Sequence, residues 1–209
     1  MDPAAPGAPP RTIRRLPARE VGRKGLHLTS AVVPALLGLG VARQRLLPAL
    51  AVLAAGALLV EVGRRRSRLT ASRFDALFAP LLRDHEHHRV TGATWLLLSF
   101  LAAVALLPRD VAIAALWAAA VGDAAAALVG IPFGRHRVGR TGKSLEGSMA
   151  CALTTTIGAL FVAALAPWIA IVAGVAAALA ERASWPHDDN ARIVAVVGVT
   201  VWLCTAVAR

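Results

Sequence analysis

The chain has 209 residues, of which 57% are hydrophobic, and its mean hydropathy is +0.62. Apolar runs recur along most of its length, which excludes a soluble globular domain and indicates a polytopic membrane protein. The formal net charge of +11 would suit a nucleic-acid-binding protein, but the placement of the cations argues against nucleic acid as a partner.

The amino-terminal segment, residues 1–22, is rich in Pro, Ala and Arg and lacks an apolar stretch that could act as a cleaved signal. We therefore expect a cytoplasmic tail, followed at 23–209 by a single transmembrane domain. The fold class expected is an all-α polytopic integral membrane protein, with about seven transmembrane helices plus one interfacial amphipathic helix. The expected spans are 26–42, 46–62, 92–107, 109–130, 145–166, 168–182 and 191–208.

The distribution of Lys and Arg predicts the orientation. Six of these residues precede the first span, seven lie between the second and third, four between the fourth and fifth, and two between the sixth and seventh. The opposite side holds only Arg43, Arg45, Arg109 and Arg209. The positive-inside rule then places the amino terminus in the cytoplasm and the carboxyl terminus outside the cytoplasmic membrane. The basic side would face an anionic phospholipid surface.

The long segment 64–90 shows a helical apolar pattern. The apolar positions are Phe74, Leu77, Phe78, Leu81 and Leu82. This spacing, with charges between, is typical of a helix lying in the membrane interface. Ser72 with Asp75 is expected to cap its start, and Pro80 to bend it. Its role is either a lipid anchor or the wall of a lipid access site.

Asp123 lies within an otherwise apolar run, about 10 Å from the inner end of the fourth span at roughly 1.5 Å per residue. An ionised carboxylate inside a membrane is costly unless a cation, metal or water-filled cavity compensates it. Two interpretations follow for Asp123. It is either a ligand of a divalent metal or half of a buried salt bridge to Lys or Arg.

A basic, glycine-containing loop follows, from Gly130 to the run Lys143-Ser144-Leu145-Glu146-Gly147-Ser148. Glycines allow backbone N–H groups to approach a phosphate, and the start of the fifth span would aim its helix N-terminus at it. A true P-loop is excluded, because Arg137 stands where that motif requires glycine.

An ordered set of motifs extends over about residues 20–195. The front motifs are Arg23-Lys24 with His27, Glu61 with Arg64-Arg65, and Arg83 and Glu86 before Thr91-Gly92-Ala93-Thr94. The back motifs are Gly122-Asp123 with Ala126, Gly130 and Gly134, Lys143 to Ser148, and Glu181 with Asp188-Asp189-Asn190. This order resembles the dolichol kinase, phytol kinase and CTP-dependent diacylglycerol kinase family.

The resemblance implies phosphoryl transfer from a nucleoside triphosphate, commonly CTP, to the hydroxyl of a membrane lipid such as a polyprenol, a phytol-like alcohol or diacylglycerol, with a divalent metal, Mg²⁺. The expected catalytic residues are Asp123, Lys143, His27 and Glu146. The expected nucleotide- and phosphate-binding residues are Arg23, Lys24, Gly130, Gly134, Ser144 and Gly147. The expected metal ligands are Asp123 with Asp188, Asp189 or Asn190. His27 and Glu146 are alternative general bases.

Other functions remain open at this stage. The family is related to phosphatidate cytidylyltransferases, so synthesis of CDP-diacylglycerol is the main alternative. A transporter would need an inverted repeat and a site at the membrane midplane, and neither is evident. A non-enzymatic scaffold would not need Asp123. The lipid acceptor, the choice between CTP and ATP and the oligomeric state are not determined by the sequence.

Overall fold

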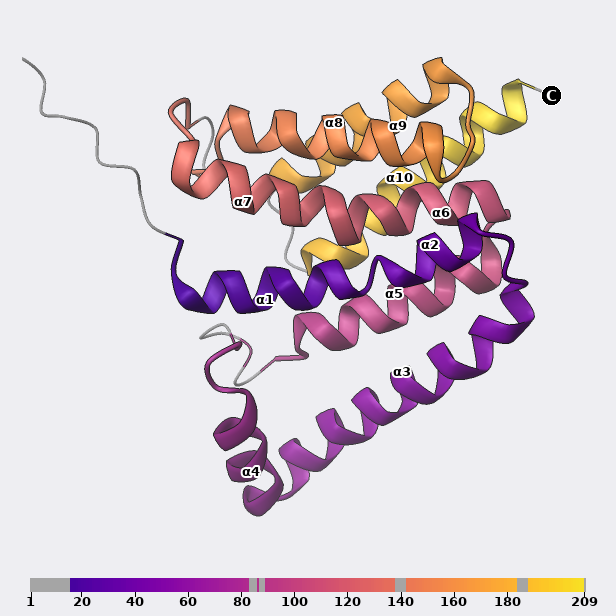
Figure 1. The fold of residues 1–209 in the computed structure, drawn as a ribbon. Coiled ribbons are helices and arrows are strands. Elements are labelled where there is room, and N and C mark those ends of the chain that lie inside the picture. Colours follow the sequence, from indigo (N-terminus) through magenta and orange to yellow (C-terminus); the bar gives the residue numbers. More distant parts are fainter. Residues whose placement is uncertain (1–15, 83–85, 87–88, 138–141, 184–187, 209) are drawn as a thin grey trace, which may run out of the picture.

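The computed structural model describes residues 16–82, 86, 89–137, 142–183 and 188–208 (Figure 1). These residues form helices and connecting turns, with no strand beyond an isolated bridge between Arg137 and Ser144. The helices are α1 (Ala18–Thr29), α2 (Val32–Gly38), α3 (Arg43–Arg66), α4 (Arg68–Phe78), α5 (Gly92–Leu106), α6 (Arg109–Trp117), a π-helical turn (Ala118–Gly122), α7 (Asp123–Phe133), α8 (Leu145–Phe161), α9 (Pro167–Arg182) and α10 (Asp189–Val207).

The centre of the bundle is the continuous helix Arg109–Phe133, composed of α6, the π-helical turn and α7. Alanines such as Ala114, Ala115 and Ala118 are fully buried on it, and α2, α8 and α10 contact it. Small side chains let these helix backbones approach closely, as is usual for helix packing in lipid. The core therefore consists of many small apolar contacts around one central helix (Figure 1).

Among the described residues, three helices are long and apolar enough to cross a membrane: Arg43–Arg66, Arg109–Phe133 and Asp189–Val207. Helices Gly92–Leu106 and Leu145–Phe161 are apolar but shorter. The all-α class is thus confirmed for the described residues, and a membrane location is supported by length and composition. The lengths of these helices do not establish all seven of the expected crossings.

The first expected span, 26–42, is not one helix. The structure instead has α1 and α2, separated by a break at Ser30 and Ala31. Pro34 explains the break, because proline has no N–H to donate to the carbonyl four residues earlier, at Ser30, and its ring crowds that carbonyl. Helix α1 also begins at Ala18, so the expected boundary between tail and domain at residue 22 falls inside it.

Helix α4 corresponds to the expected amphipathic helix, with different ends. Its cap is Ser67, whose Oγ accepts a hydrogen bond from the Thr70 N–H at 3.3 Å, so the expected cap at Ser72 is wrong. The helix ends at Phe78, and Pro80 follows it instead of bending it.

Helix α3 leaves the bundle at an angle and is mostly exposed (Figure 1). A buried polar cluster ties its end to α5. Glu61 accepts a hydrogen bond from the Thr91 N–H at 2.8 Å, and Arg64 donates to Glu61 at 2.8 Å and to the Glu86 carbonyl at 3.0 Å. These front motifs of the sequence therefore hold α3 against the start of α5.

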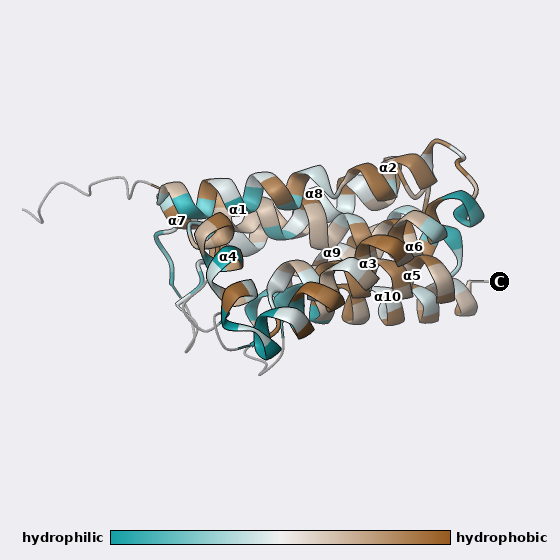
Figure 2. Cartoon of the chain, turned by 90° about the horizontal axis from the view of Figure 1, so that it is seen from below, coloured by the Kyte–Doolittle hydropathy of each residue, from teal (hydrophilic) through white to brown (hydrophobic). Residues whose placement is uncertain are grey.

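Hydrophilic residues gather at one end of the bundle. In Figure 2 most of the teal ribbon lies near the start of α1, α4 and the end of α7, and a smaller teal stretch lies at the opposite end beside α6, while the long helices are mostly brown or pale. This end carries the residues of the candidate site described next.

Candidate functional site

A pocket of about 250 Å³ lies at the hydrophilic end, between α1, α7, the start of α8 and the facing ends of α9 and α10. Its polar lining comes from five helices and the loop before α8. The lining residues are Glu20, Arg23, Lys24, Asp123, Ala126, Ala127, Gly130, Ile131, Arg137, Gly142, Lys143, Ser144, Gly147, Ser148, Glu181 and Asp189. Segments more than 160 residues apart in the sequence thus meet in one pocket.

Asp123 is the first residue after the π-helical turn and is only 6% exposed. Lys24 donates a hydrogen bond to its Oδ2, and His27 Nδ1 lies 3.8 Å from the same oxygen. The buried carboxylate is therefore compensated by a cation from α1, as the salt-bridge interpretation expected. Its remaining surface faces the pocket.

The π-helical turn shapes the backbone on which Asp123 stands. Its backbone hydrogen bonds join residues five apart instead of four, and such bulges recur at functional sites. Gly122 closes the turn against α8: a Cβ there would lie 2.6 Å from Thr155 Oγ1 and 3.3 Å from Cys151 Sγ. Glycine at this position therefore lets the central helix approach α8 closely. Asp123, the next residue, lines the pocket.

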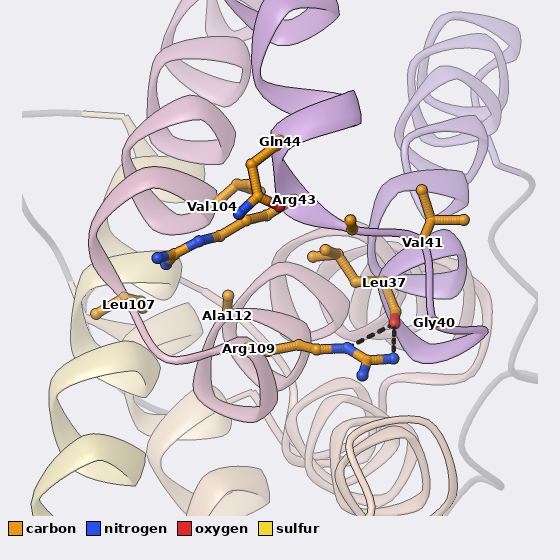
Figure 3. Close-up of a pocket in the computed structure, with 10 residues that line it drawn as sticks. Leu37, Gly40, Val41, Arg43, Gln44, Val104, Leu107, Arg109 and Ala112 are labelled. Atoms are coloured by element: carbon orange, nitrogen blue, oxygen red, sulfur yellow. Dashed lines mark hydrogen bonds between the residues drawn. The ribbon is translucent and has the colours of Figure 1, made fainter.

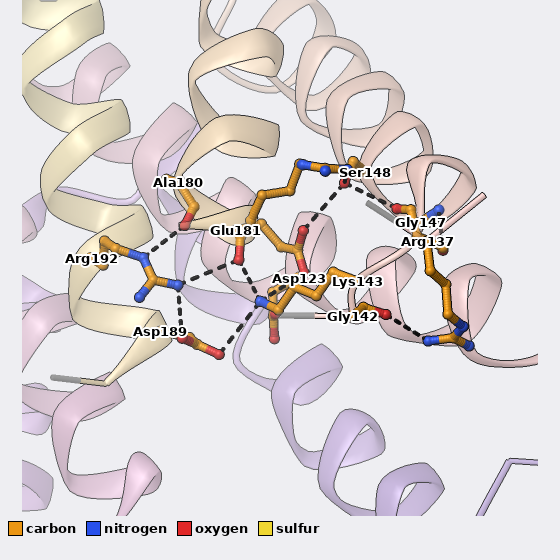
Figure 4. Close-up of polar contacts among 12 residues, drawn as sticks. Asp123, Arg137, Gly142, Lys143, Gly147, Ser148, Ala180, Glu181, Asp189 and Arg192 are labelled. Carbon is orange, nitrogen blue, oxygen red and sulfur yellow. Dashed lines mark hydrogen bonds and ion pairs between the residues drawn. The ribbon is translucent and has the colours of Figure 1, made fainter. Parts of the chain in front are cut away.

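Lys143 reaches the acidic side of the pocket (Figure 4). Its Nζ lies 2.8 Å from Glu181 Oε1 and 3.7 Å from Asp189 Oδ2. Arg192 also contacts Asp189, at 2.7 Å, and donates to the Ala180 carbonyl at 2.7 Å. Lys143 and Arg192 together neutralise two carboxylates where α9 and α10 meet.

Ser144 and two glycines join α7 to α8. Ser144 caps α8, accepting from the Gly147 N–H at 3.1 Å and donating to the Gly130 carbonyl at 3.4 Å. A Cβ on Gly147 would lie 2.6 Å from the Ala126 carbonyl oxygen, and one on Gly130 2.8 Å from Ser144 Oγ. The glycines therefore serve close helix contact, and the Gly147 N–H is engaged by the cap and is not presented to a phosphate.

Several predicted site residues do not line the pocket. His27 is buried behind Asp123, and its Nδ1 has no hydrogen-bond partner among the described residues. Gly134 packs against Ser144. Glu146 points to the surface, where it pairs with His136 at 2.8 Å. The position of Glu146 therefore does not support a role as general base in the pocket.

The predicted metal ligands are divided between two places. Asp123 and Asp189 line the pocket. Asp188 instead caps α10 by accepting from the Asn190 N–H at 2.8 Å, and Asn190 Nδ2 donates to the Gly92 carbonyl at 3.4 Å. A Cβ on Gly92 would lie 3.1 Å from Asp188 Oδ2, so two of the three side chains of the Asp-Asp-Asn run lie against the start of α5.

A resident metal centre is not built into the described part of the chain. No group of three or more His, Cys, Asp or Glu side chains is placed there to hold a metal ion. The pocket carboxylates are instead paired with Lys24, Lys143 and Arg192. Their oxygens suit Mg²⁺ chemically, but Mg²⁺ commonly uses only one or two carboxylates together with the phosphates of a substrate.

The pocket lining includes four residues with polar or charged side chains that were not among the predicted site residues: Glu20, Arg137, Ser148 and Glu181. Arg137 donates to the Gly142 carbonyl at 2.7 Å, and Ser148 Oγ lies 3.5 Å from Glu181 Oε2 (Figure 4). Glu181 is 6% exposed at the end of an apolar helix. A carboxylate in an apolar run is costly unless it is compensated, which made Asp123 a candidate site residue. The same argument applies to Glu181.

Comparison with known proteins assigns no family. No protein-family model, no curated protein and no solved structure matches this chain. The part of the chain that the structure describes defines an all-helical class of protein, with three helices long and apolar enough to cross a membrane and a charged pocket at one end of the bundle.

Proposed function

We propose that the protein is a membrane lipid-alcohol kinase that transfers the γ-phosphoryl group of a nucleoside triphosphate, CTP in the first instance, to a lipid hydroxyl. The observation that carries the proposal is the pocket at the end of the apolar bundle. Among the described residues that line it, the cations are Arg23, Lys24, Arg137 and Lys143 and the carboxylates are Glu20, Asp123, Glu181 and Asp189. A polyphosphate with its divalent metal requires both signs of charge in one place.

The location supports the same proposal. A lipid alcohol reaches an enzyme from the bilayer and a nucleotide reaches it from water, so the reacting groups must meet where apolar helices end. The pocket lies at such an end. Asp123 is buried at the start of α7, and the helix reaches the exposed turn after Phe133, about 15 Å further along at 1.5 Å per residue. Its volume of about 250 Å³ suits phosphates better than a whole nucleotide, so the base would extend outward.

The residue roles follow from their partners. Lys143 and Lys24 now neutralise carboxylates, and both would turn to the phosphates when Mg²⁺–CTP enters. Mg²⁺ supplies charge neutralisation of the triphosphate when bound, and Asp123 and Asp189 are the pocket carboxylates that could face it. His27, with its Nδ1 directed at Asp123, is the remaining candidate for proton transfer through that carboxylate.

The proposal also includes the orientation of the protein in the membrane. With seven crossings and a cytoplasmic amino terminus, the pocket faces the compartment that holds CTP. The same cation count that predicts this orientation also brings the basic end of the protein to the anionic lipid surface of the cytoplasmic membrane.

The test is a product analysis with purified protein in lipid vesicles. CTP and ATP, each labelled on the γ-phosphate, are combined in turn with a polyprenol, a phytol-like alcohol and diacylglycerol. A kinase places the label in the lipid and releases the nucleoside diphosphate. Label found only in pyrophosphate, with cytidine monophosphate joined to a lipid phosphate, would establish the cytidylyltransferase alternative. If no combination of nucleotide and lipid gave transfer, both the kinase and the cytidylyltransferase functions would be excluded.

A further inference from the structure

A second pocket, of about 300 Å³, lies at the opposite end of the bundle (Figure 3). Its apolar floor includes Leu37, Val104 and Ala112, and its polar rim includes Arg43, Gln44 and Arg109. Arg109 begins the central helix and Gly130, in the first pocket, lies near its end. The two pockets are therefore about 32 Å apart along that helix, at 1.5 Å per residue, which is close to the thickness of a bilayer's hydrocarbon core.

One cation of this rim is fixed in place. Arg109 Nε donates to the Leu37 carbonyl at 2.9 Å and its Nη2 to the Gly38 carbonyl at 3.3 Å, which caps the C-terminal end of α2. The chain then turns at Gly40, whose φ of +96° favours glycine. The guanidinium thus stays beside the pocket with its remaining N–H groups available.

The other cation lacks a protein partner. Arg43 extends across the pocket toward Leu107 (Figure 3), and no acceptor among the described residues receives a hydrogen bond or ion pair from it. None of the described acidic residues lines the pocket. Two of the four cations assigned to this side of the membrane therefore flank a single apolar hollow without a counter-charge.

We propose that this pocket binds the headgroup phosphate of an anionic phospholipid from the leaflet opposite the proposed active site. Arg43 and Arg109 supply the charge for the phosphate, because guanidinium groups form strong charge-assisted hydrogen bonds to it. The floor of Leu37, Val104 and Ala112 receives the glycerol and the first acyl carbons. The occupant is thus an amphiphile whose acyl chains continue along the lipid-facing side of α3 and α5.

The experiment titrates delipidated full-length protein in neutral detergent with phosphatidylglycerol and with phosphatidylcholine, and it measures bound lipid by native mass spectrometry. Arg43→Gln removes the unpartnered cation and keeps the helix. The matched control is Arg45→Gln, which removes an exposed cation of the same end that does not line the pocket. Arg109 is left intact because its loss would uncap α2.

We expect wild type and Arg45→Gln to bind one phosphatidylglycerol more tightly than phosphatidylcholine, and Arg43→Gln to bind it roughly tenfold or more weakly, as for the loss of one hydrogen bond to a charged group. Equal affinity of Arg43→Gln and wild type would overturn the proposal, as would equal binding of the two lipids. Equal losses in both variants would show a diffuse charge effect and overturn it too. The kinase assay is independent of this result, because Arg43 lies outside the first pocket.

Discussion

At the residue scale, the central feature is the buried pair of Asp123 and Lys24. Both side chains are nearly inaccessible, and each compensates the other's charge. Removing one partner of such a pair leaves an unpaired buried charge, which costs more than the pair itself contributes. A single substitution at Asp123 therefore mixes loss of chemistry with loss of stability.

A double-mutant cycle separates the two effects. Asp123→Asn and Lys24→Gln should each lower the free energy of unfolding by about 3 to 5 kcal/mol, and the double variant should recover much of it. Thermal unfolding in detergent, followed by tryptophan fluorescence, measures stability, and lipid phosphorylation measures turnover. On the proposed mechanism the double variant stays inactive. Recovery of turnover together with stability would make the pair purely structural.

Lys143 gives a second prediction at the same scale. It lies between Glu181 and Asp189 at the mouth of the pocket. Lys143→Ala should reduce transfer about 10²- to 10³-fold, because a cation placed at developing charge contributes that order of rate. Arg135→Ala is the control, since Arg135 is an exposed cation just beyond α7 that does not line the pocket. Similar losses in both variants would refute a specific role for Lys143.

At the scale of elements, the joint between α7 and α8 decides the shape of the pocket. Ser144 caps α8 and contacts α7, and the glycines on both helices allow backbone atoms to touch. The same joint carries Asp123 on one helix and positions Lys143 just before the other. Small changes in its spacing should therefore move both functional groups.

Gly147→Ala tests that joint. The added Cβ would meet the Ala126 carbonyl at 2.6 Å, and backbone cannot move aside as a flexible side chain can. We expect a loss of about 1 to 3 kcal/mol in the free energy of unfolding. Gly56→Ala in α3 is the matched control, since no atom lies within 4 Å of its Cβ position. It should be neutral or slightly stabilising, because alanine favours helix over glycine. Equal melting temperatures for the two variants would contradict the close contact.

At the scale of the whole molecule, the charged pocket and the second pocket occupy opposite ends of the central helix. Three helices have the length and composition to cross a membrane, and α5 and α8 are shorter. The proposed orientation places the first pocket in the cytoplasm and the second at the other surface.

Reporter fusions test this arrangement. A fusion after Arg66 and one after Gly142 should score cytoplasmic, whereas one after Pro108 should score external, as the positive-inside rule requires. Protease accessibility in sealed vesicles is an independent check. An external score after Gly142 would separate Lys143 from cellular nucleotide and would remove the proposed mechanism.

Part of the candidate site was predictable because it leaves local signals. Asp123 interrupts an apolar run, and Lys143 and Ser144 stand directly before another. The break at Ser30 was not predicted, although Pro34 marks it, because Pro34 could equally have been accommodated within a kinked span. Glu146 lies outside the pocket lining and pairs with His136, and its position at a helix start does not determine which way its side chain turns.

The sequence by itself determined the helical class, the apolar character of the long helices and the buried carboxylate at Asp123, because composition and periodicity are local properties. Only the tertiary structure decided the partners. It paired Asp123 with Lys24 over 99 residues, brought Glu181 to Lys143, and turned Asp188 away from the pocket as a helix cap. The physical reason is that helix periodicity defines which face a residue occupies, whereas the neighbour that meets this face depends on how all the helices pack together.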